Sequence, residues 1–165
     1  MKRLVILGAG GYGRTVADIA HQLDYATIVL DDAVPAHPLS SFQSYIDSST
    51  SFIPAFGNNI FRMEWINRIE EGGGQLATLI HPTAYISPKA SIACGTVILP
   101  HAIINTDVVM GKGCIINLGA IVDHGCILEE GVHIAPGAIV KGDNRIAKCS
   151  KIEAGEVMER GQYPP

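Results

Sequence analysis

The chain has 165 residues, of which 47% are hydrophobic but only 6% aromatic, and its formal net charge is −4 at pH 7. Charged residues make up only 17%, which argues against a disordered chain, and the scattered basic residues argue against nucleic-acid binding. The longest uncharged stretches, 72–88 and 90–106, are interrupted by Gly, Pro and His, so neither provides the ~20 apolar residues of a membrane-spanning helix. The first residues lack the long apolar region of a signal peptide, and we therefore expect a cytoplasmic protein.

Residues 1–79 contain eight of the ten aromatic residues and alternate between strand and helix patterns. We expect strands at Arg3–Gly8, Ala26–Leu30, Ser51–Phe56 and Gln75–Leu79, and helices at Gly13–Leu23 and Asn59–Glu71. Residues 33–51, rich in Pro and Ser, read as a long loop. This order predicts a small Rossmann-like α/β domain with a parallel sheet.

A glycine-rich turn connects the first predicted strand to the first helix, with Gly8, Gly10, Gly11 and Gly13 spaced as Gly-x-Gly-x-x-Gly. Small residues let a phosphate approach the backbone at a helix N-terminus, and Asp31 and Asp32 end the second strand where a ribose-binding acid is expected. About 80 residues are too few for a full dinucleotide-binding domain, so a single nucleotide or nucleotide sugar fits better than NAD. The competing interpretation is a turn whose glycines serve only tight packing.

From residue 80 onward an apolar residue recurs every six positions without an insertion. The thirteen positions are Ile80, Ile86, Ile92, Ile98, Ile104, Met110, Ile116, Val122, Leu128, Ile134, Val140, Ile146 and Ile152. A six-residue period with many β-branched side chains predicts a β-solenoid with three short sides per coil and 18 residues per coil. We therefore expect a solenoid over 80–157 of about four coils, followed by a C-terminal tail at 158–165. Burial of the narrow inner column alone does not offset the conformational entropy lost by 78 ordered residues. This favours an oligomer, in which further surface is buried.

Three histidines, His101, His124 and His133, fall in the repeat, but at different places of the six-residue unit. Three nitrogens of a zinc site therefore do not converge, which disfavours a metal centre of the γ-type carbonic anhydrase kind. The four cysteines show no Cys-x-x-Cys spacing and are expected to be buried free thiols. His124 follows Asp123, and a histidine held by a carboxylate is suited to act as a general base near neutral pH. The alternative is a surface histidine in a turn.

The segment from Ile116 to Cys126, with Asn117, Asp123 and His124, resembles the hexapeptide-repeat sugar acetyltransferases. It is most similar to the family of sialic acid O-acetyltransferases and UDP-amino-sugar N-acetyltransferases. Gly8–Gly13, Asp31-Asp32 and Gly57-Asn58 with Arg62 also resemble that family's N-terminal domain.

This resemblance implies a left-handed parallel β-helix, a homotrimer, and acetyl-coenzyme A (acetyl-CoA) as co-substrate, bound between neighbouring β-helices. It implies His124 as the base that deprotonates an amine or hydroxyl of a nucleotide-linked sugar for glycan synthesis, with Asp123 and Asn117 as further catalytic residues. His133 matches a position near the acceptor. An offset of one coil from His124 leads to Gly142, whose N–H is a candidate donor to the thioester oxyanion.

The chain departs from this family at two places. Many members carry an acidic residue directly after the histidine, where this chain has Gly125. The repeat also degrades from Asn144 onward, where relatives continue for further coils that line the coenzyme A groove. The alternative hypothesis is therefore a non-catalytic sugar-nucleotide-binding trimer that has lost a complete coenzyme A groove.

Overall fold

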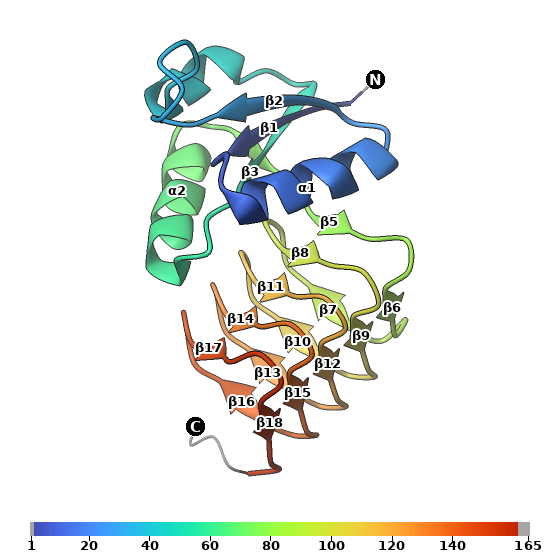
Figure 1. The fold of residues 1–165 in the computed structure, drawn as a ribbon. Coiled ribbons are helices and arrows are strands. Elements are labelled where there is room, and N and C mark those ends of the chain that lie inside the picture. The colour runs from blue at the N-terminus through green and yellow to red at the C-terminus, as the bar shows by residue number, and fades with distance from the viewer. Residues whose placement is uncertain (1, 162–165) are drawn as a thin grey trace. The chain divides into compact units, whose positions relative to one another are not determined.

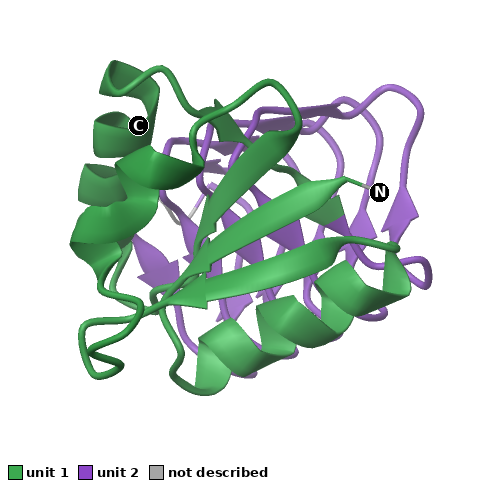
Figure 2. Cartoon of the chain, turned by 90° about the horizontal axis from the view of Figure 1, so that it is seen from above, with its two compact units in different colours: residues 1–79 green, residues 80–165 purple. Residues whose placement is uncertain are grey.

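The computed structural model describes residues 2–161 and divides into two compact units, Met1–Leu79 and Ile80–Pro165 (Figure 2). Within the described residues, none of the helices combines the length and the apolar character needed to cross a lipid bilayer.

The first unit is a four-stranded parallel sheet with two helices (Figure 1). Its elements are β1 (Arg3–Leu7), α1 (Gly11–Gln22), β2 (Ala26–Leu30), the 3-10 helix η1 (Leu39–Tyr45), β3 (Thr50–Pro54), α2 (Asn59–Glu71) and β4 (Gln75–Leu76). The strand order is β2-β1-β3-β4. Central strand β1 reads Leu-Val-Ile-Leu and is fully buried from Leu4 to Leu7, because a parallel strand packed on both faces needs a continuous apolar run.

The sequence prediction differs from this unit at two places. The loop expected at 33–51 contains η1, where buried Leu39 and Phe42 anchor a tight turn and the Ser41 hydroxyl donates to the Pro38 carbonyl. A Ser-rich segment reads as a loop because its two apolar anchors are too few to produce a periodic signal. The last predicted strand is shorter than expected, since β4 ends at Leu76 and Leu79 begins β5 (Leu79–Ile80), which belongs to a different sheet.

The second unit is a stack of two-residue strands. They are β5 (Leu79–Ile80), β6 (Tyr85–Ile86), β7 (Ser91–Ile92), β8 (Val97–Ile98), β9 (Ile103–Ile104), β10 (Val109–Met110), β11 (Ile115–Ile116), β12 (Ile121–Val122), β13 (Ile127–Leu128), β14 (His133–Ile134), β15 (Ile139–Val140), β16 (Arg145–Ile146), β17 (Lys151–Ile152) and β18 (Val157–Met158).

Every third strand pairs in parallel, which produces three sheets in the orders β17-β14-β11-β8-β5, β18-β15-β12-β9-β6 and β16-β13-β10-β7 (Figure 1). Pairs such as Ile121 with Ile139 are 18 residues apart, so the expected coil length is confirmed. The fold is a left-handed parallel β-helix. The second residue of each strand points into the bore and forms one continuous apolar core from Ile98 to Met158.

The core extends beyond the predicted end of the repeat. Met158 is only 8% exposed and belongs to the inner column, so assigning it to the tail was wrong. The remainder of the predicted tail is described only as far as Gly161, and residues 162–165 lie outside the described residues.

The turns follow one rule: the third residue after each inner residue from Ile92 to Met158 has a positive φ. These residues are Gly95, His101, Asp107, Gly113, Gly119, Gly125, Gly131, Gly137, Asp143, Cys149, Gly155 and Gly161. Glycine adopts this left-handed conformation without strain, and Asp is among the side chains that tolerate it best. Gly125 and Asp143 therefore occupy equivalent turn positions one coil apart.

The four cysteines, all within the described part of the chain, form no disulfide. Cys114 and Cys126 are buried, as expected for free thiols, whereas Cys94 is exposed and Cys149 half-buried, so the expectation of burial is wrong for these two. The reason is positional: Cys114 and Cys126 fill the small inward position of the hexad, and Cys94 lies in a turn.

Candidate functional site

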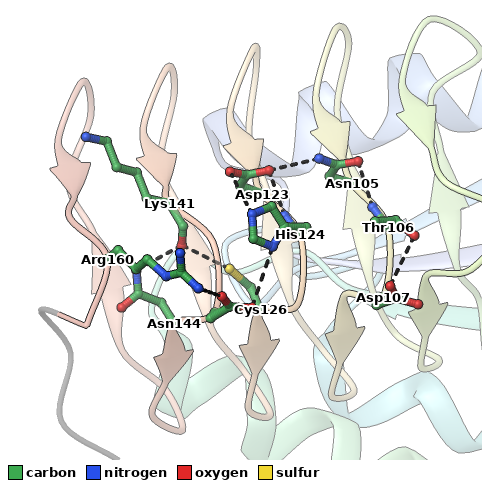
Figure 3. A network of polar contacts seen from close by, with 10 residues as sticks. Asn105, Thr106, Asp107, Asp123, His124, Cys126, Lys141, Asn144 and Arg160 are labelled. Atoms are coloured by element: carbon green, nitrogen blue, oxygen red, sulfur yellow. Dashed lines mark hydrogen bonds and ion pairs between the residues drawn. The ribbon is translucent and has the colours of Figure 1, made fainter.

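His124 lies at the corner that follows β12, and its side chain is 47% exposed. Figure 3 shows the imidazole beside the Asp123 side chain, with Asn105 in line with Asp123 on the preceding coil. Two carboxylates flank the ring: Asp123 Oδ2 is 3.9 Å from His124 Nε2, and Asp143 Oδ1 is 3.5 Å from His124 Nδ1. His124 is thus a surface histidine in a turn, and two carboxylates lie beside its ring.

Asp123 is held rigidly by N–H donors. Its Oδ1 accepts a hydrogen bond from the Asn105 amide at 2.8 Å and another from the backbone N–H of His124 at 2.7 Å. The Asn105 bond, followed by the His124 N–H, lowers the pKa of the Asp123 carboxyl below its usual value. Asp123 is consequently a fixed anion at neutral pH, placed to stabilise an imidazolium.

Gly142 lies one coil beyond His124, as the 18-residue offset predicts. A Cβ at this position would be 2.5 Å from His124 Cε1 and 2.6 Å from His124 Nε2. The imidazole therefore packs directly onto backbone that only glycine leaves open. The Gly142 N–H is the weakest of the four causes that lower the pKa of Asp123.

Asn117 and His133 form a second cluster at a different corner, because Asn117 follows β11 and His133 begins β14. Asn117 Oδ1 accepts from the N–H of Leu118, which fixes the amide so that its Nδ2 faces His133 Nε2 at 3.0 Å. Because Nδ2 is a donor, His133 accepts through Nε2 and carries its proton on Nδ1. The two corners flank the sheet that contains β12.

The glycine turn of the first unit lines a cavity of about 510 Å³. The lining residues are Gly8, Gly10, Gly11, Tyr12, Asp31, Ala55, Phe56, Gly57, Asn58 and Phe61. Helices α1 and α2 both begin at this cavity, and α1 has no side-chain cap, so its first N–H groups remain available to an anion. Phe56 and Phe61 pack edge-on with ring centroids 4.6 Å apart and supply an aromatic wall.

The four motif glycines serve two different purposes. A Cβ on Gly13 would overlap the Gly8 carbonyl oxygen, and a Cβ on Gly8 would come within 3.0 Å of the Ala55 carbonyl oxygen. These two glycines are therefore required for packing. By contrast, a Cβ on Gly10 would meet nothing within 4 Å, and one on Gly11 would meet only the end of Arg14 at 4.0 Å. Packing does not explain Gly10 and Gly11, which open into the cavity.

The two acidic candidates after β2 separate in the structure. Asp31 lines the glycine cavity, and its carboxylate accepts from the Ala33 N–H at 2.8 Å and the Ala9 N–H at 2.6 Å. These bonds lower the pKa of Asp31, the Ala33 bond most strongly, and tie the glycine turn to β2. Asp32 instead lines another cavity with Trp65 and accepts from the Leu39 N–H at 2.9 Å. The structure therefore does not bring Asp32 to the predicted nucleotide site.

Three residues at the cavity escaped the sequence interpretation. Phe56, Phe61 and Tyr12 carry no motif signal, although Tyr12 lies between the last two glycines of the turn. The Tyr12 hydroxyl is buried and has no hydrogen-bond partner among the described residues, and burial raises its pKa. The hydroxyl is therefore protonated at neutral pH. Arg62, which the resemblance did include, is buried and donates to the Phe56 carbonyl at 2.9 Å.

Asp143 beside His124 also escaped the interpretation, although the 18-residue offset leads from Gly125 to it just as it leads from His124 to Gly142. Among residues 2–161, no three His, Cys, Asp or Glu side chains are grouped in a way that would hold a metal ion.

The chain combines a small Rossmann-like unit that contains a glycine cavity with a left-handed β-helix of six-residue repeats, the fold of hexapeptide-repeat acyltransferases. Residues 3–69 match the family model described as the PglD N-terminal domain. The acetyltransferase domain of PglB from Neisseria gonorrhoeae FA1090, solved in complex with acetyl coenzyme A, is 34% identical, with a TM-score of 0.87 over 94% of this chain and 81% of that one. The chain belongs to the family of hexapeptide-repeat sugar acetyltransferases.

Two further comparisons are more limited. UDP-N-acetylbacillosamine N-acetyltransferase of Bacillus subtilis (strain 168) is 31% identical over 113 residues, 60% of this chain, and the chain spans only 52% of the length of that relative. A mutant perosamine N-acetyltransferase from Caulobacter crescentus, in complex with CoA and GDP-perosamine, is 23% identical with a TM-score of 0.77 over 97% of this chain and 90% of that one. That likeness shows the fold alone.

Proposed function

We propose that this protein transfers an acetyl group from acetyl-CoA to an amine of a nucleotide-linked sugar. The observation that carries the proposal is the exposed imidazole of His124, packed on Gly142 between the carboxylates of Asp123 and Asp143. The relative from Neisseria gonorrhoeae supports acetyl-CoA as the donor, because it was solved with that molecule. The relative from Bacillus subtilis, named for a UDP-linked amino sugar, supports an amine rather than a hydroxyl as the acceptor.

In the proposed reaction, His124 Nε2 takes a proton from the acceptor amine while the amine nitrogen attacks the thioester carbonyl carbon. The resulting oxyanion accepts a hydrogen bond from a backbone N–H, for which Gly142 is the candidate because it lies against the imidazole. The carbon–sulfur bond then breaks, and the imidazolium returns its proton to the thiolate of coenzyme A. No acyl-enzyme is formed.

The nucleotide end of the acceptor is assigned to the glycine cavity of the first unit. Its diphosphate would meet the uncapped N-terminus of α1 beside Gly10 and Gly11, where both the open backbone and the helix dipole favour an anion. The aromatic wall of Phe56 and Phe61 offers a surface for the base. Asp31 positions the turn by accepting hydrogen bonds from the backbone N–H groups of Ala9 and Ala33, and we assign it this role rather than direct contact with the ribose.

We further propose that the protein works as a homotrimer. The outward residues of the sheet β6-β9-β12-β15-β18 are all apolar: Tyr85, Ile103, Ile121, Ile139 and Val157. Tyr85 is 57% exposed and Val157 44%, an unusual amount of apolar surface for one column. A second copy covering this sheet would lie next to both corners and would bring its Asn117–His133 cluster toward the His124 of its neighbour.

The first test is release of thiol from acetyl-CoA in the presence of UDP-linked 4-amino sugars, with the corresponding hydroxyl sugars as comparison. His124→Ala is expected to lower turnover by about 10²- to 10⁴-fold, the usual contribution of a general base. Equal rates for wild type and His124→Ala would show that His124 is not the base. Binding of UDP-sugars without binding of coenzyme A or release of thiol would favour the non-catalytic alternative. Light scattering tests the trimer, and a monomer would contradict the shared site.

A further inference from the structure

The space beside position 125, directly after His124, is filled by a side chain from the next coil. A Cβ on Gly125, the residue directly after the histidine, would overlap Oδ1 of Asp143. The Asp143 carboxylate thus occupies the volume in which a side chain at position 125 would begin. Both residues have a left-handed backbone conformation, with φ of +66° at Gly125 and +61° at Asp143. The same turn position in consecutive coils is therefore a glycine in one coil and an aspartate in the next.

The Asp143 carboxylate is oriented by charges on both sides. Its Oδ1 is 3.5 Å from His124 Nδ1, and its Oδ2 forms an ion pair with the Arg160 guanidinium, which comes from the following coil. The Asp143 N–H donates to the His124 carbonyl at 2.9 Å, so the two residues are also linked through the backbone. The carboxylate and the imidazole are therefore held next to each other by the coil itself.

The two carboxylates beside His124 face different ring nitrogens. Asp123 Oδ1 is already occupied by the N–H donors of Asn105 and His124, and its Oδ2 lies nearest Nε2 at 3.9 Å. Asp143 is the carboxylate nearest Nδ1. A general base that uses Nε2 needs a proton on Nδ1, and an acceptor at Nδ1 stabilises that tautomer and the imidazolium that follows.

We propose that Asp143 is the positioning residue for His124, and that it supplies from the neighbouring coil the carboxylate that Gly125 cannot supply. The proposal rests on the assignment of His124 as the base. Asp143 holds Nδ1–H, which leaves Nε2 unprotonated and directed toward the acceptor. Asp123, next to Nε2, stabilises the positive charge after proton transfer. Arg160 pairs with the Asp143 carboxylate and limits the directions in which it can turn.

The first experiment compares Asp143→Asn with Asp107→Asn, which changes the same turn position two coils earlier. Asn keeps the left-handed conformation in both variants, so their stabilities should be similar. Asp143→Asn is expected to lower kcat by about tenfold or more, a fraction of the contribution of a general base, with KM for acetyl-CoA nearly unchanged. Asp107→Asn should keep wild-type kcat. Equal kcat in wild type and Asp143→Asn would overturn the proposal.

The second experiment exchanges the two residues. Gly125→Asp alone puts two carboxylates into one space and should lower activity and stability, whereas Gly125→Asp combined with Asp143→Gly restores a single carboxylate beside the ring. The double variant is expected to regain most of the lost kcat. A double variant no more active than Gly125→Asp alone would show that Asp143 acts only by supporting the coil, and would overturn the proposal.

The third measurement does not depend on turnover. The ¹⁵N shifts of the His124 ring report its tautomer, which the Asp143 carboxylate beside Nδ1 and the Asp123 carboxylate beside Nε2 both influence. Asp143→Asn should reduce the Nδ1–H population of the ring, because the carboxylate nearest Nδ1 is then absent. Unchanged ring shifts would overturn the proposal even if activity fell. Loss of activity in Asp143→Asn with full activity in His124→Ala would instead reject the proposed base.

Discussion

Replacing Gly142 by Ala separates the position of the His124 ring from the stability of the β-helix. The new Cβ would lie 2.5 Å from Cε1 and 2.6 Å from Nε2 of His124. Carbon atoms in ordinary contact are about 3.5 Å apart or more, so the ring must move by about 1 Å. Because the His124 side chain is 47% exposed, it can turn toward solvent at little cost. A displacement of about 1 Å from productive geometry lowers the rate by about 100-fold, equivalent to about 2.7 kcal/mol in the barrier.

Stability should not fall in the same variant. Gly142 has no positive φ, so Ala fits its backbone, and the less flexible unfolded chain is expected to stabilise the fold by about 0.4–1 kcal/mol. Gly155→Ala is the matched control with the opposite outcome. Its Cβ would meet nothing, but its φ of +70° strains any Ala there, so it should lower the melting temperature and leave kcat unchanged.

The assay is thiol release from acetyl-CoA with the best UDP-4-amino sugar, at saturating concentrations of both substrates, alongside a thermal melt of each variant. Gly142→Ala with wild-type kcat would refute the reasoning, because the imidazole would then not need the position that the structure shows. A fall in kcat together with a melting temperature below the assay temperature would also refute the reasoning, since loss of folding would then explain the loss of activity.

Three further predictions concern other parts of the chain. Gly10→Ala should weaken UDP binding by about tenfold or more without changing the melting temperature, because its Cβ enters only the cavity. Gly13→Ala should instead cost about 1–3 kcal/mol of stability, because its Cβ overlaps the Gly8 carbonyl. Calorimetry of UDP binding and thermal melts distinguish the two variants, and similar effects from both would contradict the assignment of Gly10 to the ligand and Gly13 to packing. Asp31→Asn tests a pH effect: the pKa of Asp31 is lowered in the folded protein, so its stabilisation is complete above the unfolded-state pKa of about 3.9 and is lost as the pH falls through the lower folded-state value. The difference in melting temperature between wild type and Asp31→Asn should thus be constant between pH 6 and 8 and disappear in acid, and a difference that grew in acid would reverse the assignment. Asn144→Ala removes the donor to the Lys141 and Glu159 carbonyls and should destabilise the last coil by about 1–3 kcal/mol. The expected readout is faster hydrogen exchange at β18 with little change in β6. An equal increase in exchange across the whole β-helix would count against this prediction.

Most of the fold of the second unit could be predicted from the repeat, because one periodic pattern determines both the register of the strands and the residues of the core. Ile104, Val122 and Val140 are 18 residues apart, and each coil can bury its apolar residue only if it stacks on the next. The same arithmetic predicted that His124 would lie over Gly142. In the first unit, buried β1 and the two helices were predicted for the same reason, since their apolar patterns span whole elements. Helix η1 was missed because only Leu39 and Phe42 mark it.

The candidate site was predicted less completely. Asp31 and Asp32 are adjacent in the sequence and equally acidic, yet their carboxylates bond N–H groups of different loops, and only Asp31 lines the glycine cavity. Likewise, Asn117 and His124 belong to one motif, but a three-sided coil places them at different corners. Motif membership predicts neither of these outcomes, because neighbouring residues in a turn diverge in direction.

What the sequence determined by itself was the coil, that is, its length of 18 residues and its apolar bore. What only the tertiary structure decided was which charges surround the imidazole of His124. The carboxylate nearest its Nδ1 comes from Asp143, 19 residues further along the chain, and reaches the ring because Gly125 has no side chain in that space. Contacts of this kind depend on side-chain directions in two stacked turns, and a pattern along one strand contains no information about them.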